Sequence, residues 1–586
     1  MKIDIVNPLK SYKFNSAYLI LIILSLGLFI VLSTSANADL TTGRFALFMD
    51  ERITFDGVKK ILHPVDYQQF WEAIVDGDQR YGRSLWISMA AASFLPEWIW
   101  GEPGQIISGR MLQVFLIEST CLILAFGLLQ NWFLRLVLIV SILSIPFSEY
   151  YASMPKPEPL QLLFLSIFCF YFFKNNLKFG WYWLFAGLAF GTKISTLPAL
   201  VVFSFFSLIY SEAPKRDSKL HFWAPLEVSA LYFSIGLGLA VPILFTPILY
   251  LAFCYFGVGF LSKKLDFGRL LKAILLLSSF FPAIYLFKSP LKVWIGSTFL
   301  NTKHGADQSS TTYLTWIEYF FNEWLIAPKV TGYALALITL IFIICFCTFA
   351  YQKRGLSTKK IAALAILLAG AALNASIIFG AKRLWGFYLY PGAVLFICGL
   401  LVMINLSLNE MATERDKAKV KILQALAYAV TLGLFSISIL FWSVSAANTF
   451  EDLSRRTQSK EYVDQYESYK QILSFLNTSL SAPSKPAIVM FTPSLFPPLS
   501  NENYQIIEFG GPYNWNQSPE VIILGLINTP RGSATPKDSP LYEKFLLERQ
   551  GYFEHVAEKG SNCRVIPCFE RVLTLVNGGE ILTLRK

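Results

Sequence analysis

Charged residues are scarce in this sequence. Asp, Glu, Lys and Arg make up 15% of its 586 residues, whereas soluble globular domains carry about 25%. This scarcity excludes a water-soluble multidomain enzyme. It also excludes a largely disordered chain and a coiled coil, because both are rich in charged residues.

Several sequence patterns are missing as well. The chain contains no P-loop, no glycine-rich dinucleotide loop and no Ser-His-Asp spacing, so nucleotide-dependent and serine-hydrolase chemistry are not indicated. Ten-residue segments of alternating hydrophobicity, typical of membrane β-barrels, do not recur. Helical membrane spans are the remaining architecture.

What the sequence has is apolar residues, 54% of the total, arranged in runs long enough to cross a hydrocarbon core of about 30 Å. We predict an α-helical polytopic membrane protein with about 13 transmembrane helices. The expected spans are 17–34, 108–129, 132–149, 160–174, 178–192, 195–210, 226–240, 243–261, 269–288, 330–351, 361–380, 385–407 and 422–444. The pair around Pro242 can also be read as one kinked or re-entrant element.

The net charge of +11 reflects topology and not a nucleic-acid partner. Basic residues gather in short connectors, such as Lys174 with Lys178 and Lys263 with Lys264. Connectors of this kind stay in the cytoplasm. With Lys2, Lys10 and Lys13 before the first span, this rule also places the amino terminus inside.

Three segments are expected outside the membrane: 35–107, 289–329 and the tail 446–586, which leaves 1–445 as a transmembrane domain. Residues 35–38 resemble a signal-peptidase site, although an uncleaved first span is the preferred interpretation. The tail changes to short strand-like runs at 487–491, 521–524, 572–575 and 581–584, which predict a soluble extracytoplasmic α/β domain. Cys563 and Cys568 lie in this tail at a spacing that suits a local disulfide.

Two adjacent carboxylates, Asp50 and Glu51, follow the first span. Such a pair at a membrane surface can supply one general base and one orienting or metal-binding partner. The alternative from spacing alone is an ion-paired loop neutralised by Arg44 or Arg52.

A second acid, Glu158, lies between Pro157 and Pro159 at the next external turn. We expect the prolines to hold this backbone extended, and pairing with Lys156 is the structural alternative. Basic and tyrosine side chains share the same membrane face. They are Tyr81, Arg83, Lys193, Lys382, Arg383, Tyr388 and Tyr390. Cations on an outer face suggest a bound anion such as a phosphate. The alternative is that each side chain extends to the polar membrane interface without binding a ligand.

Glu118 lies in the middle of the second span. An acid at that depth suggests ion or proton coupling in a transporter, and a structural hydrogen bond to another span is the preferred interpretation.

The order of these elements resembles the GT-C superfamily of polytopic glycosyltransferases, which use polyprenyl-phosphate sugars. The similarity rests on Asp50-Glu51 after the first span, Tyr81-Gly82, the proline-framed Glu158 and Gly191-Thr192-Lys193. It covers the first ~210 residues best. The layout is closest to bacterial lipid A aminoarabinose transferases, with thirteen spans and a periplasmic carboxy-terminal domain, and to protein O-mannosyltransferases.

The resemblance implies roles for these residues. Asp50 would be the catalytic base and Glu51 would support it, while Glu158 would line the same cavity. Tyr81, Arg83, Lys382, Arg383 and Tyr388 would bind the lipid phosphate. No cofactor is required by the pattern, and a divalent cation held by Asp50 and Glu51 remains an option.

The expected activity is inverting transfer of a sugar from a polyprenyl-phosphate donor to a lipid, glycan or protein acceptor. The expected place is the outer face of a bacterial inner membrane. A polyprenyl-linked saccharide transporter or flippase is the alternative, and a non-catalytic scaffold ranks last.

Overall fold

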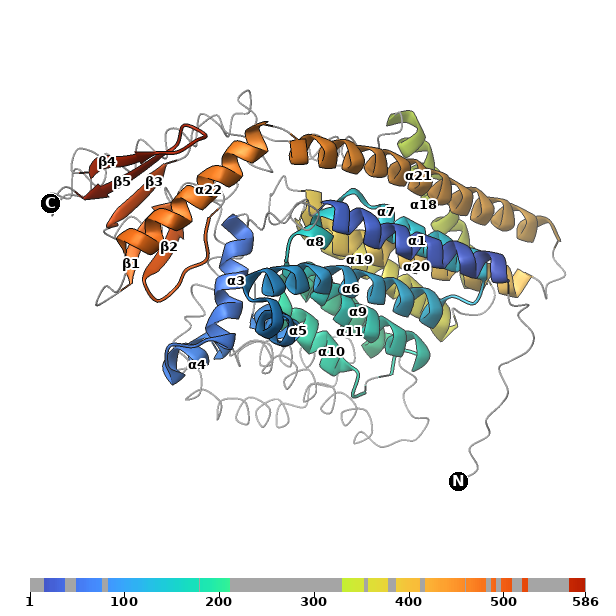
Figure 1. Ribbon diagram of the computed structural model, residues 1–586. Helices are drawn as coiled ribbons and strands as arrows, with labels where there is room; N and C mark the ends of the chain where they lie inside the picture. Colours follow the sequence, from blue (N-terminus) through green and yellow to red (C-terminus); the bar gives the residue numbers. More distant parts are fainter. Residues whose placement is uncertain are drawn as a thin grey trace, which may run out of the picture. The chain divides into compact units, whose positions relative to one another are not determined.

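The computed structural model describes residues 15–36, 49–75, 83–178, 180–210, 329–352, 357–377, 386–411, 417–458, 460–480, 486–491, 497–508, 519–524 and 569–584 (Figure 1). The chain divides into two compact units. The first comprises Met1–Ser33, Val75–Ser88 and Arg110–Asn448, and the second comprises Thr34–Ile74, Met89–Gly109 and Thr449–Lys586.

The first unit is helical throughout its described part. Its elements are α1 (Ser16–Ala36), the start of α5 (Arg83–Trp100), most of α6 (Glu102–Leu128), α7 (Trp132–Ser144), α8 (Pro146–Ser153), α9 (Pro157–Lys174), α10 (Trp183–Thr192), the 3₁₀ turn η1 (Ile194–Thr196), α11 (Leu197–Tyr210), α18 (Lys329–Gln352), α19 (Thr358–Ala375), η6 (Gly386–Leu389), α20 (Tyr390–Met411) and much of α21 (Lys417–Gln458).

Five helices of the described part are long and apolar enough to cross a membrane: Ser16–Ser33, Glu102–Leu128, Thr358–Ala375, Tyr390–Asn409 and Ile422–Ser443. Shorter apolar helices cover Trp132–Ser144, Trp183–Thr192, Leu197–Ser207 and Leu337–Thr348. The protein is therefore a polytopic helical membrane protein. The count of thirteen spans stays a prediction, since the expected spans 226–240, 243–261 and 269–288 lie outside the described residues.

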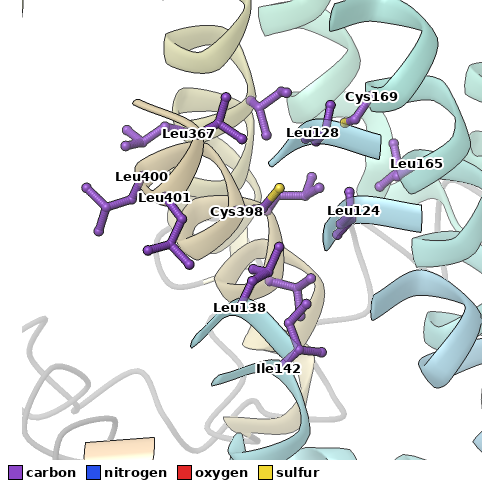
Figure 2. Packing of buried hydrophobic residues seen from close by; sticks show 14 of the residues in the cluster. Leu124, Leu128, Leu138, Ile142, Leu165, Cys169, Leu367, Cys398, Leu400 and Leu401 are labelled. Carbon is purple, nitrogen blue, oxygen red and sulfur yellow. The ribbon is translucent and has the colours of Figure 1, made fainter. Parts of the chain in front are cut away.

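The core of the first unit forms where α6, α7, α9, α19 and α20 meet. Figure 2 shows Cys398 of α20 among leucines of the neighbouring helices, including Leu124, Leu138 and Leu165. All four side chains are fully buried. Such close packing stabilises helix association in lipid, where apolar burial alone gives little preference for a neighbouring helix.

Helices α19 and α20 approach each other at glycines. A Cβ atom on Gly370 would lie 2.4 Å from the Phe396 nitrogen, and one on Gly399 would lie 2.4 Å from the Leu367 nitrogen. Small residues allow two membrane helices to pack backbone against backbone. No larger side chain fits at these positions without moving a helix.

Several of the expected boundaries are wrong, such as the start of the span expected at 178, where α10 begins at Trp183, and proline explains one of the differences. The span expected over 132–149 is broken, because α7 ends at Ser144 and α8 begins at Pro146. Proline lacks an N–H and blocks the preceding turn, so it starts a helix more readily than it continues one. The second span begins six residues earlier than expected, at Glu102, and it contains Arg110 and Glu118, as the expected range 108–129 also does.

The second unit contains α3 (Met49–Leu62), most of α4 (Tyr67–Val75), α22 (Lys460–Ser479) and a mixed five-stranded sheet of order β2-β1-β3-β5-β4. The strands are β1 (Ala487–Phe491), β2 (Tyr504–Glu508), β3 (Val521–Leu524), β4 (Phe569–Thr574) and β5 (Glu580–Leu584). β1 pairs in parallel with β2 and β3, whereas β5 is antiparallel to β3 and β4.

Helix α22 covers the sheet through Ile472 and Leu476, which share a buried cluster with Val489, Ile506 and Ile523 (Figure 1). The four strand-like runs read from the tail are strands, and β2 is an additional one. The expected division of the chain at residue 445 falls within α21, which continues to Gln458.

Candidate functional site

The structure describes some of the expected site residues and not others. Glu51, Glu158, Lys193, Tyr388 and Tyr390 have described side chains. Asp50 and Arg83 are placed only as helical positions at the starts of α3 and α5. Tyr81, Lys382, Arg383, Cys563 and Cys568 lie outside the described residues.

Glu158 belongs to the first turn of α9, which corrects the expectation of an extended backbone. Pro157 begins the helix, and the extended residue is the N-cap Lys156, with φ −137° and ψ 156°. Proline suits the first helical position because the N–H that it lacks has no partner there. The carboxylate thus lies at the positive end of the helix dipole.

Lys193 forms an ion pair with Glu158. It caps the carboxyl end of α10 with an extended backbone, and its ammonium donates a hydrogen bond to Glu158 Oε1. The two side chains are 17% and 2% exposed. Little water screens a pair this sheltered, so the attraction between the two charges is stronger than in a surface pair, and removing one partner would leave an uncompensated buried charge.

Tyr388 completes a group of three side chains. The Lys193 ammonium lies 4.5 Å from the centroid of the Tyr388 ring, a cation–π distance. Tyr388 comes from η6, immediately before α20. The structure therefore brings together three of the residues expected at the site, from α9, α10 and η6, and we call Glu158, Lys193 and Tyr388 the carboxylate–lysine cluster.

Two further tyrosines adjoin this cluster. The ring of Tyr151 lies 5.3 Å from the ring of Tyr390, and both are fully buried. Burial raises the pKa of Tyr151 well above its usual range, and the nearby Glu158 adds to this rise. Tyr151 is therefore a neutral hydrogen-bond donor beside the carboxylate at every physiological pH.

Polar atoms with unused hydrogen-bonding capacity lie near the cluster. Glu158 Oε2 and the Tyr390 hydroxyl are buried and have no hydrogen-bond partner within the described residues. Buried polar atoms in proteins are nearly always satisfied, by protein, water or ligand. Either atom can therefore take a hydrogen bond from water or from a polar ligand.

Sequence reasoning missed Gln161, which holds the cluster in place. This residue is fully buried one turn beyond Glu158, and its Nε2 donates to Thr196 Oγ1 at 2.7 Å. Thr196 Oγ1 in turn donates to the Lys193 carbonyl oxygen at 2.7 Å. The sequence feature that identifies Gln161 is a polar amide within an apolar span, three residues after Glu158 and therefore on the same helix face.

The carboxylates of the first external segment lie on α3. Glu51 is fully buried, although few of the residues next to it in the sequence are apolar. Arg52 donates to Asp56 at 2.5 Å, one turn along the helix. The sequence suggests Arg44 or Arg52 as the cation that neutralises Asp50 and Glu51; the structure pairs Arg52 with Asp56, and Arg44 lies outside the described residues.

Asp56 also joins α3 to the segment before β2 within the second unit. Its Oδ1 accepts from the Ser500 nitrogen at 2.9 Å, and its Oδ2 accepts from Ser500 Oγ at 3.0 Å. Ser500 Oγ accepts from the Ile506 nitrogen of β2 at 3.1 Å. Helix α3 is therefore tied directly to the sheet domain.

Two further polar features are not among the expected site residues. Arg110 is 2% exposed and lies inside the α6 span, and the signal for it was a basic residue within an apolar run. Asp76-Gly77-Asp78 is an Asp-x-Asp sequence in a segment outside the described residues. In the part of the chain that is described, no three His, Cys, Asp or Glu residues are grouped to hold a metal ion.

Fold and site together define an integral membrane protein with a sheltered carboxylate–lysine cluster and a helix-borne pair of acids joined to a mixed-sheet domain. No family model matches the sequence, and no curated protein does.

Among solved structures, the crystal structure of ArnT from Cupriavidus metallidurans bound to undecaprenyl phosphate aligns with a TM-score of 0.43 and 10% identity, over 97% of this chain and 98% of that one. The apo structure of the same protein gives a TM-score of 0.42 at 10% identity, with the same coverage. Similarity at this level assigns neither a family nor an activity, so the proposal below rests on the residues.

Proposed function

We propose that this protein is an integral membrane glycosyltransferase of the GT-C type. It moves a sugar from a polyprenyl-phosphate donor to an acceptor at the extracytoplasmic face. The observation that carries the proposal is the meeting of Glu158, Lys193 and Tyr388, together with a Glu158 oxygen that has no hydrogen-bond partner among the described residues. The resemblance in sequence implies that Glu158 lines the substrate cavity and that Tyr388 binds the lipid phosphate, and Lys193 is one of the outer-face cations expected to meet an anion.

In the proposed reaction, Asp50 accepts the proton of an acceptor hydroxyl or amine. The acceptor lone pair forms a bond to the anomeric carbon while the bond from that carbon to the phosphate oxygen breaks. The electron pair leaves with polyprenyl phosphate, and the configuration inverts, as in other single displacements at this carbon. The donor bond supplies the free energy, so no nucleotide is consumed.

In this scheme, Lys193 stabilises the negative charge of the departing phosphate. An ammonium has three donors, and one of them is used by Glu158. The carboxylate and the Tyr388 ring fix the ammonium before substrate arrives, so no reorganisation is needed as negative charge grows. Losing one such preorganised donor typically costs about 10²- to 10³-fold in kcat.

In the same scheme, the sheet domain orients α3. Because Asp56 is held by Ser500, the helix that carries Asp50 and Glu51 has a fixed orientation within the second unit. A general base acts only within hydrogen-bond reach of the proton it takes. The domain is thus a support for the catalytic helix.

The test uses the full-length protein in lipid nanodiscs with a panel of radiolabelled polyprenyl-phosphate sugars. We expect release of polyprenyl phosphate from at least one donor and a loss of about 10²- to 10⁴-fold in Asp50→Asn, the usual share of a general base. Asp66→Asn is the matched control, since Asp66 is an exposed residue before α4 whose side chain accepts a hydrogen bond from the nearby Gln69 nitrogen. Equal activity in the two variants would remove Asp50 from the reaction.

A further inference from the structure

A second polar site lies at the other end of the α9–α10 hairpin. A cavity of about 490 Å³ is lined by Lys174, Asn175, Asn176, Lys178, Gly180, Trp181 and Tyr182. Ligand pockets typically measure about 300–1,000 Å³. The cavity therefore has room for a phosphate ester headgroup.

Its position is set by the helix that it shares with Glu158. Glu158 lies in the first turn of α9 and Lys174 is its last residue, so their backbones are about 24 Å apart at 1.5 Å per residue. That separation is close to the thickness of a hydrocarbon core, about 30 Å. The cavity and the carboxylate–lysine cluster thus face opposite surfaces of the membrane.

The lining has the chemistry of an anion site. Lys174 and Lys178 are exposed, and neither forms an ion pair with another residue in the described part of the chain. Trp181, 46% exposed, packs on Tyr171 with ring centroids 4.7 Å apart. Tryptophan is a typical residue of the headgroup region, which suits a site at the membrane surface.

An unusual backbone holds these groups in place. Asn176 and Leu177 have φ values of 50° and 66°, a left-handed conformation that costs a branched or bulky residue free energy. Leu177 is fully buried, and the Tyr182 hydroxyl donates to the Lys178 carbonyl oxygen. Burial of Leu177 and this hydrogen bond fix the turn that presents both lysines.

We propose that this cavity binds the phosphate group of an anionic membrane lipid. The two ammonium groups contact the phosphate. Asn176 Oδ1, which is buried and accepts no hydrogen bond within the described residues, accepts one from a headgroup hydroxyl. Inorganic phosphate presents part of the same chemistry, so the experiment separates the two sources. The proposal stands whether or not the protein transfers sugars.

The test is native mass spectrometry of the full-length protein in detergent, with phosphatidylglycerol, phosphatidylcholine or inorganic phosphate added. We expect phosphatidylglycerol to bind in preference to phosphatidylcholine. The Lys174→Gln/Lys178→Gln variant should bind it about 30-fold more weakly, since each basic residue near an anionic headgroup contributes about 1 kcal/mol. Binding of inorganic phosphate with the same dependence on the lysines would support the anion site and assign it to the free ion.

Two further variants make the result specific. Lys174→Arg/Lys178→Arg keeps both charges and should bind as the original protein does. Lys359→Gln removes an exposed lysine at the start of α19, outside the cavity lining, and should also leave binding unchanged. If the double variant does not fold, Lys174→Gln or Lys178→Gln alone replaces it, with an expected loss in affinity of about 5-fold. Undiminished binding by the glutamine variants, or an equal loss in Lys359→Gln, would overturn the proposal.

Discussion

Removing Lys193 should destabilise the protein through the charge that it leaves behind. Glu158 is 2% exposed, and its ion-pair partner is 17% exposed. Breaking a buried pair by deleting one partner typically costs about 3–5 kcal/mol, because the remaining charge is uncompensated. Lys193→Met keeps the length of the side chain and removes the charge, so we expect a loss of about 3 kcal/mol, at the lower end because Lys193 is partly exposed.

The double variant Lys193→Met/Glu158→Gln separates stability from function. With both charges gone, no uncompensated charge is left, and replacing a buried pair by neutral residues of similar volume is often close to neutral. We expect the double variant to recover about 2 kcal/mol of the loss. Sugar transfer should remain impaired in both variants, because the ammonium that meets the phosphate is absent from each.

The assay is thermal and denaturant unfolding in nanodiscs, followed by tryptophan fluorescence, beside the transfer assay. Lys470→Met is the matched control, since Lys470 pairs with Glu467 at 2.7 Å while both are about half exposed, at 52% and 45%. Exposed pairs contribute about 0–1 kcal/mol. A loss in Lys193→Met no larger than in Lys470→Met, or a double variant less stable than the single one, would refute the reasoning.

Three other predictions concern the tether, the helix packing and pH. Ser500→Ala removes one of the two hydrogen bonds to Asp56 and should lower kcat several-fold with little change in KM. The control Thr478→Ala, at an exposed hydroxyl of α22, should change neither kcat nor KM. A change in KM alone in Ser500→Ala would argue against a positioning role. Gly370→Val places a side chain 2.4 Å from the Phe396 nitrogen and should cost at least about 1–3 kcal/mol, measured as lost folded yield, whereas Gly27→Ala has no atom within 4 Å and should be tolerated. Burial, with Glu102 and Asp56 nearby, raises the pKa of Tyr504 from 10.0 to about 12. As the pH rises, the unfolded state therefore loses this proton first, and about 2–3 kcal/mol of stability should be lost between pH 10 and 12. Tyr504→Phe should abolish this loss in unfolding experiments.

The sequence identified the side chains of the cluster but not their pairing. Glu158, Lys193 and Tyr388 all stand out as polar residues next to apolar runs. That Lys193 reaches Glu158, 35 residues away, depends on how α9 and α10 pack as a hairpin. Periodicity gives the helices but not the rotation of each about its axis, so the contact required the structure.

The misreadings have physical causes too. A proline on each side of Glu158 predicts extended backbone, but Pro157 and Pro159 lie in the first turn of α9, where a proline gives up no hydrogen bond. Strand β2 follows the polar stretch Asn501-Glu502-Asn503 and has only a short apolar core, so its pairing with β1 is what makes it a strand. The Asp56–Ser500 contact spans 444 residues, a separation at which sequence pattern carries no signal.

The most direct test of the account is whether the carboxylate of Asp50 is needed for chemistry at the donor. Original protein and Asp50→Asn, reconstituted side by side and shown to be folded, would be given the polyprenyl-phosphate sugar that the panel identifies. The proposed reaction predicts that the unaltered protein releases polyprenyl phosphate and glycosylates an acceptor with inverted configuration, and that Asp50→Asn does both about 10²- to 10⁴-fold more slowly. Transbilayer movement of the donor with its sugar linkage intact, and equal in both proteins, would contradict it.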